Sequence, residues 1–147
     1  MKLRYILIPL ILILIVVGVY VGYNVLQSSS KYQLSSRNEM NPVDFLFPGG
    51  IKQTSETYTG QGITYHIRVM QFSNEQEAIE GISKLEEQYN PAMIGLDGKY
   101  VRYKEASPTS HMYYYKSGKY IIFVDFTGDK DSGDNFIMWY YSKYTNK

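Results

Sequence analysis

The stretch YIIFVDF, residues 120–126, decides how this chain folds. Successive residues of a β-strand point to opposite faces of its sheet. Here one face would carry Tyr120, Ile122, Val124 and Phe126, and the other would carry Ile121 and Phe123. Because both faces are apolar, the pattern predicts a central strand that is covered on both sides. The rest of the sequence must therefore supply two covering elements.

The first cover is an amphipathic helix predicted over residues 73–89, SNEQEAIEGISKLEEQY. Ser73 or Asn74 can cap its N-terminus in a capping box, and Asn90 with Pro91 ends it. Its apolar side chains share one stripe at helical spacing: Ala78, Ile79, Ile82, Leu85 and Tyr89. This helix can cover only one face of the sheet.

The second cover is the C-terminal segment NFIMWYYSKYTNK, residues 135–147. A helix here would begin after Asp134, an acidic residue that suits a helix N-terminus, and would carry an aromatic stripe. As a strand, the segment's aromatic content fits better by propensity. The need to cover residues 120–126 favours the helix, and one more strand stays open as the alternative.

The remaining strands are predicted from alternation and turns. Residues 63–72, ITYHIRVMQF, alternate apolar and polar side chains, as a half-buried strand does. Asp97-Gly98 and Ser117-Gly118 predict tight hairpin turns, and TGQGIT at residues 59–64 predicts a third connection. Together these patterns predict an α+β fold. It would have an antiparallel sheet of about five or six strands and the helix at 73–89; if the C-terminal segment is a helix, it covers the other face.

The N-terminal part of the chain has the composition of a membrane span. No charged residue occurs in residues 5–26, and ILIPLILILIVVGVYV at residues 6–21 is apolar throughout. As a helix, residues 5–23 would span roughly 27 Å, close to the hydrocarbon thickness of a bilayer. The run is longer than the apolar part of a cleavable signal peptide, which is about 7–15 residues. A retained signal-anchor helix is therefore predicted, with cleavage after residues 28–30 as the alternative.

The division of the chain follows from this segment. Residues 1–4 would form a cytoplasmic stub, because Lys2 and Arg4 favour the inner side of the membrane. Residues 27–42 are rich in Ser and Asn, which predicts a flexible stalk. Residues 43–147 would then form an extracytoplasmic α+β domain of a single-pass cell-membrane protein.

Composition excludes several classes of function. The chain has 147 residues with 16 tyrosines and no cysteine, which rules out disulfides, thiolate metal sites and cysteine nucleophiles. Two of the 15 Lys and Arg residues lie in the N-terminal stub, so the rest nearly balances the 14 Asp and Glu. A near-neutral domain without a basic run lacks the charge that binding of nucleic acid requires. No nucleic-acid partner is expected.

The acidic loop DFTGDKDSGDNF, residues 125–136, resembles a calcium loop only in part. Counted from Asp129, an EF-hand would need an oxygen ligand at Gly133 and a glutamate at Tyr140. The sequence therefore predicts a solvated connection in which Asp134 caps the following segment. Weak calcium binding by Asp129, Asp131 and Asp134 stays open, and no cofactor or other metal site is predicted.

Few other side chains suggest a site. Two histidines without H-x-H or i,i+4 spacing do not predict a zinc site. A row of exposed tyrosines would suit a sugar ring or another protein, whereas a buried row would stabilise the sheet. The candidates for a binding surface are Tyr113, Tyr115, His111, His66 and Arg68.

The leading prediction of function is a membrane-anchored binding or interaction module, or an accessory subunit of an envelope complex, with a protein or glycan partner. It rests on the anchor, the stalk, the aromatic content and the lack of any familiar catalytic motif. Two alternatives remain. One is a membrane-tethered hydrolase with His66 or His111 as base, and the other is a calcium-stabilised surface domain.

Overall fold

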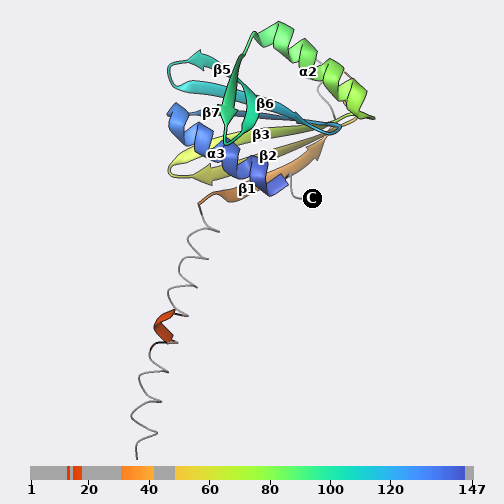
Figure 1. The fold of residues 1–147 in the computed structure, drawn as a ribbon. Coiled ribbons are helices and arrows are strands. Elements are labelled where there is room, and N and C mark those ends of the chain that lie inside the picture. Colours follow the sequence, from red (N-terminus) through yellow and green to blue (C-terminus); the bar gives the residue numbers. More distant parts are fainter. Residues whose placement is uncertain (1–12, 14, 18–30, 42–48, 145–147) are drawn as a thin grey trace, which may run out of the picture. The chain divides into compact units, whose positions relative to one another are not determined.

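The computed structural model describes residues 13, 15–17, 31–41 and 49–144, and its central feature is a single sheet (Figure 1). Seven strands pair in the order β1-β2-β3-β7-β6-β5-β4, and every strand pair whose register is defined is antiparallel. The strands are β1 Gln33–Met40, β2 Lys52–Gly60, β3 Ile63–Gln71, β4 Ala92–Leu96, β5 Lys99–Ser107, β6 Ser110–Ser117 and β7 Tyr120–Thr127; the helices are α2 Glu75–Tyr89 and α3 Lys130–Tyr144. The predicted α+β class is confirmed, with seven strands rather than five or six.

The predicted membrane segment lies mostly outside the described residues. Within residues 5–26 the structure describes only 13 and 15–17, which are helical. Among the described residues, no helix is both long enough and apolar enough to cross a membrane. Residues 34–147 form a compact unit by themselves.

Strand β1 lies where the sequence predicted part of a flexible stalk. All eight of its residues are exposed, so it buries no side chain that could have produced an apolar pattern. It is the edge strand of the sheet beside β2. Two of its side chains form salt bridges with side chains of β2: Glu39 with Lys52 at 2.9 Å, and Arg37 with Glu56 at 3.5 Å. The polar composition that indicated a stalk is also the composition of a solvated sheet edge.

Strand β7 occupies the centre of the sheet, as its two apolar faces predict. It pairs with β3 on one side and with β6 on the other. On one face Ile121 and Phe123 join the cluster that α2 covers. On the other face Phe126 lies beneath α3, within reach of a Cβ at Gly133. The two helices therefore form the outer layers, and the sheet forms the middle layer.

Helix α2 begins and ends where its sequence signals lie. The Asn74 side chain accepts a hydrogen bond from the Glu77 amide at 2.9 Å, and the Glu77 carboxylate accepts one from the Ser73 amide at 3.4 Å. This pair is a variant of the capping box, because Glu77 accepts from the residue before the N-cap; the N-cap side chain is typically worth about 1 kcal/mol. At the other end Asn90 is left-handed with φ of 45°, which turns the chain into β4.

Helix α3 resolves the ambiguity of the C-terminal segment in favour of a helix, but it starts earlier than predicted. Its cap is Asp129, whose carboxylate accepts hydrogen bonds from the Ser132 amide at 2.8 Å and the Ser132 hydroxyl at 2.7 Å. The prediction of Asp134 as the cap was wrong, because Asp134 lies inside the helix. A cap five residues earlier adds residues 130–134 to the helix and brings Gly133 against the sheet.

We predict that Gly133→Ala lowers the free energy of unfolding by about 1–3 kcal/mol, the usual cost of overpacking. A Cβ here would overlap the Phe126 ring and lie 3.1 Å from Cε2 of Tyr113. That clash opposes the gain of about 1 kcal/mol that Ala has over Gly in a helix. Denaturant unfolding of the full chain, followed by circular dichroism, measures the change. The control is Asn135→Ala at an exposed position of α3, which should lose nothing; an equally stable Gly133→Ala variant would contradict the packing.

Candidate functional site

The five predicted binding-surface residues divide between the two faces of the sheet. Tyr113, Tyr115 and His111 face α3 and are buried, with exposed fractions of 0%, 2% and 3%. His66 and Arg68 lie on the α2 face, where His66 is exposed and Arg68 is half-buried. The tyrosine row is thus part of the core and forms no exposed platform, although Tyr115 also lines a cavity described below. The two histidines point to opposite faces, so they do not share a pocket.

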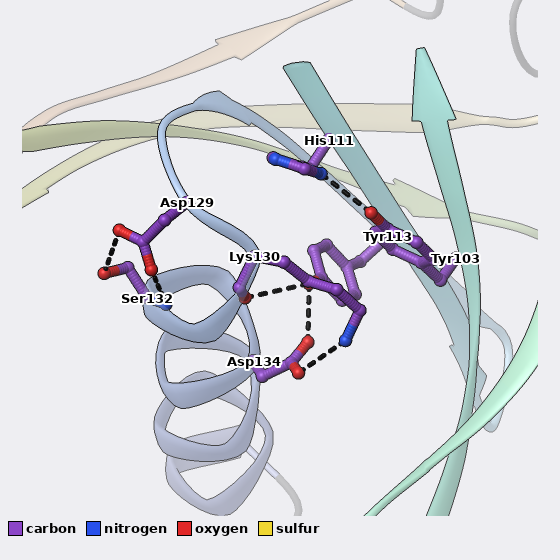
Figure 2. A network of polar contacts seen from close by, with 7 residues as sticks. All are labelled: Tyr103, His111, Tyr113, Asp129, Lys130, Ser132 and Asp134. Carbon is purple, nitrogen blue, oxygen red and sulfur yellow. Dashed lines mark hydrogen bonds and ion pairs between the residues drawn. The ribbon is translucent and has the colours of Figure 1, made fainter. Parts of the chain in front are cut away.

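His111 belongs to a buried polar network at the start of α3 (Figure 2). Its Nε2 lies 3.0 Å from the Gly128 carbonyl, which can only accept, so Nε2 carries hydrogen and donates. Its Nδ1 lies 2.8 Å from the Tyr103 hydroxyl, which donates to it. Both ring nitrogens are engaged, and the ring ties β6 to β5 and to the loop before α3.

Tyr113 connects the sheet to the first turns of α3 (Figure 2). Its hydroxyl donates to the Asp134 carboxylate at 2.6 Å, and the second oxygen of Asp134 accepts from Lys130 Nζ at 2.6 Å. Burial, followed by the hydrogen bond and charge of Asp134, raises the pKa of Tyr113 far above its ordinary value. The phenol therefore stays protonated and acts as a structural donor.

The acidic loop supplies helix-stabilising contacts. Asp129 caps α3, and the hydrogen bonds from Ser132 hold the pKa of its carboxyl below the ordinary value. Asp134 binds Tyr113 and Lys130, while Asp131 is exposed in the first turn. In residues 13, 15–17, 31–41 and 49–144 no three or more His, Asp or Glu side chains are grouped so that they could hold a metal ion.

The part of the α2 face around His66 is shallow and polar. In the strand register His66 lies opposite Asp125, which also pairs with Arg68 at 3.6 Å. A hollow of about 350 Å³ is present here, lined among others by Thr64, His66 and Asp125. The neighbouring apolar cluster beneath α2 does not extend to these residues.

A larger cavity of about 700 Å³ lies on the α3 face at the end of the sheet marked by Lys52, Gln71 and Tyr120. We call it the α3-face cavity. Its apolar floor and walls include Val69, Tyr115, Ile122, Tyr120 and Tyr140, and its charged residues are Arg37, Glu39, Lys52, Glu56 and Lys119. Two of these charged residues come from β1, so the cavity depends on a strand that the sequence did not reveal.

The charges around this cavity are largely paired. Glu56 is 3% exposed and accepts a hydrogen bond from the Tyr140 hydroxyl at 3.0 Å, with Arg37 Nε at 3.5 Å. The hydrogen bond and charge of Lys52 hold the pKa of Glu39 below its ordinary value. Lys119 lies 6.0 Å from the centre of the Tyr120 ring and forms no ion pair in the described part of the chain.

The α3-face cavity has the features of a binding site. An apolar floor removes a ligand's apolar surface from water, and charged groups at the edge orient it. Among the described lining residues there is no histidine, and both carboxylates, Glu39 and Glu56, are paired with cations. Comparisons of the chain with protein-family models, curated proteins and solved structures gave no match.

Adjacent tyrosines on β6 test the role of the polar network. We predict that Tyr113→Phe lowers the free energy of unfolding by about 1.5–3 kcal/mol, because it removes a buried hydrogen bond to a carboxylate. Denaturant unfolding of the full chain near neutral pH measures this loss. An unchanged stability would contradict the network's role in holding α3.

Tyr114→Phe is the matched control, on the opposite face. The Tyr114 hydroxyl is buried and has no hydrogen-bond partner among the described residues, so its removal should cost little or should stabilise. Burial, followed by the Glu86 charge, raises the pKa of Tyr114 from 10.0 to about 12. A raised pKa gives stability that is complete below about pH 10 and is lost as the pH rises towards 12. Tyr114→Phe should make this alkaline loss smaller.

Proposed function

We propose that this chain is a single-pass, membrane-anchored protein whose extracytoplasmic α+β domain binds a partner in the α3-face cavity. The cavity carries the proposal, because it combines a volume of about 700 Å³ with an apolar floor and a charged edge. The proposed partner is a protein of the same envelope, which makes the chain an interaction module or accessory subunit.

The chemistry of the cavity favours a partner segment with an apolar side chain beside a carboxylate. Val69, Tyr115 and Ile122 offer an apolar floor. The charged residues comprise three cations and two carboxylates, and both carboxylates already have cationic neighbours. Lys119 is therefore the cation that an incoming carboxylate would meet, and the Tyr120 ring beside it adds an aromatic surface.

Binding is favoured over the hydrolase alternative on geometric grounds. His111 is buried with both ring nitrogens hydrogen-bonded, so it has no access to a substrate. His66 lies on an open sheet face beside Asp125, in the shallow hollow described above, which would not exclude water from a reaction. Neither histidine lines the α3-face cavity.

The proposed anchor is residues 5–26, on the strength of their apolar composition. We predict that the full chain stays with membranes through alkaline carbonate washing, and that protease outside intact cells removes the domain. Val16→Arg should weaken this retention, because a charge at the centre of a span costs about 2.5–3.5 kcal/mol on insertion scales. Ser29→Arg, beyond the span, is the control. A chain released by carbonate without any substitution would contradict the anchor.

Site-specific photo-crosslinking tests the cavity. We predict that p-benzoylphenylalanine in place of Tyr120, which is 38% exposed at the cavity wall, captures one defined protein in intact membranes. The same group in place of Glu87, an exposed residue of α2, should not capture that protein. Lys119→Glu should reduce the capture, since it reverses the charge that attracts the carboxylate. Equal capture at both positions, or capture of a glycan instead, would overturn the proposal.

A further inference from the structure

The two edges of the sheet differ in charge. Strand β1 carries Arg37 and Glu39, both in ion pairs with β2. Strand β4, at the opposite edge, reads AMIGL and has no charged residue. Charges on an edge discourage pairing with another chain, whereas an uncharged apolar edge offers its backbone N–H and C=O groups to a further strand. Of the two edge strands of the described sheet, β4 is therefore the one without charges that oppose such pairing.

The surface beside β4 is also apolar. Met93 is 56% exposed, and Tyr100 on the neighbouring strand is 73% exposed, the largest fraction among the exposed apolar side chains of the described residues. Tyr100 lies opposite Gly95 in the β4–β5 register, so it stands next to the edge on the α2 face. An exposed apolar patch continuous with an unprotected strand edge indicates a contact surface.

We propose that two copies of this chain associate through their β4 strands, which pair antiparallel about a two-fold axis at Ile94. Ile94 is the middle residue of the five, so this register is the one that pairs the whole strand with its copy. It places Ile94 opposite Ile94, Met93 opposite Gly95, and Ala92 opposite Leu96. The two seven-stranded sheets then join into one continuous sheet.

The side chains of β4 complement each other in this register. A Cβ built at Gly95 would be in ordinary van der Waals contact with Cε1 of Tyr100, at 3.9 Å, and would meet no other atom within 4 Å, so the Tyr100 ring lies beside this glycine. In the proposed register Met93 of the second copy would lie opposite Gly95, where its thioether would pack at the edge of the Tyr100 ring. Flexible methionines pack well on aromatic rings in this way.

A second copy fits this edge better than an unrelated strand does. Self-pairing of an uncharged strand brings no like charges together, and it makes a closed two-fold pair. Pairing of β4 with β1 of another copy would instead continue without end and would set charged side chains against apolar ones. A contact of five residues is small, so the pair is expected to be weak in dilute solution. Confinement by the proposed anchor would raise the local concentration.

Disulfide trapping tests the pair, since the chain has no cysteine of its own. In the full chain, reconstituted in phosphatidylcholine vesicles at low density, Ile94→Cys should give a covalent dimer on mild oxidation. The control is Ile79→Cys, at a position of α2 that is 41% exposed. This variant should cross-link several-fold more slowly. Equal rates at both positions would overturn the proposal, because they would reflect random collision.

Charge substitution tests the register. Adding Met93→Lys to the Ile94→Cys chain should reduce trapping, and so should adding Gly95→Glu. Mixing these two variants should restore it as a mixed dimer, since residue 93 of one copy faces residue 95 of the other. Circular dichroism checks that each variant is folded. Failure of the mixture to recover, with both variants folded, would refute the two-fold pairing at Ile94.

Discussion

The removal of both faces of β7 from water is the constraint on which the structure depends. A large apolar side chain gains about 1.5–3 kcal/mol when it is fully buried, and β7 presents such side chains on each face. One helix cannot cover both faces, so α2 covers Ile121 and Phe123 while α3 covers Phe126. Each helix is about as long as the other, and neither covers the whole of its face. The α3-face cavity and the hollow beside His66 lie where the cover ends.

Several of the side chains that bury the α3 face of the sheet are tyrosines, and each brings a polar hydroxyl into the buried layer. A buried phenol adds apolar area, but its hydroxyl requires a partner. Tyr113 meets Asp134, and Tyr140 meets Glu56. Glu56 also lines the α3-face cavity. A ligand that disturbed Glu56 would therefore disturb the contact between β2 and α3, so the cavity is coupled to the packing of the helix.

Local patterns allowed much of this fold to be predicted. The two-sided apolar strand, the capping box at Asn74 and the turn at Asp97-Gly98 all depend on residues that are neighbours in the sequence. Strand β1 could not be found, since it buries nothing and is held by pairing with β2. The sequence offered both an exposed and a buried reading of Tyr113, because the outcome depends on which face α3 covers. The α3-face cavity depends on both strand β1 and the face that α3 covers, so no sequence pattern indicated it.

The proposed partner cavity and the proposed β4–β4 contact lie towards opposite edges of the sheet. This arrangement affects how two associated copies would bind a partner. The α3-face cavity extends from β1 to β6, whereas β4 is the opposite edge of the sheet. A two-fold axis perpendicular to the joined sheet keeps the α3 faces of both copies on the same side. Pairing through β4 would thus leave both cavities open and facing one way. Two weak sites held in this manner bind a partner with paired segments more tightly than either site alone, since the second contact becomes intramolecular.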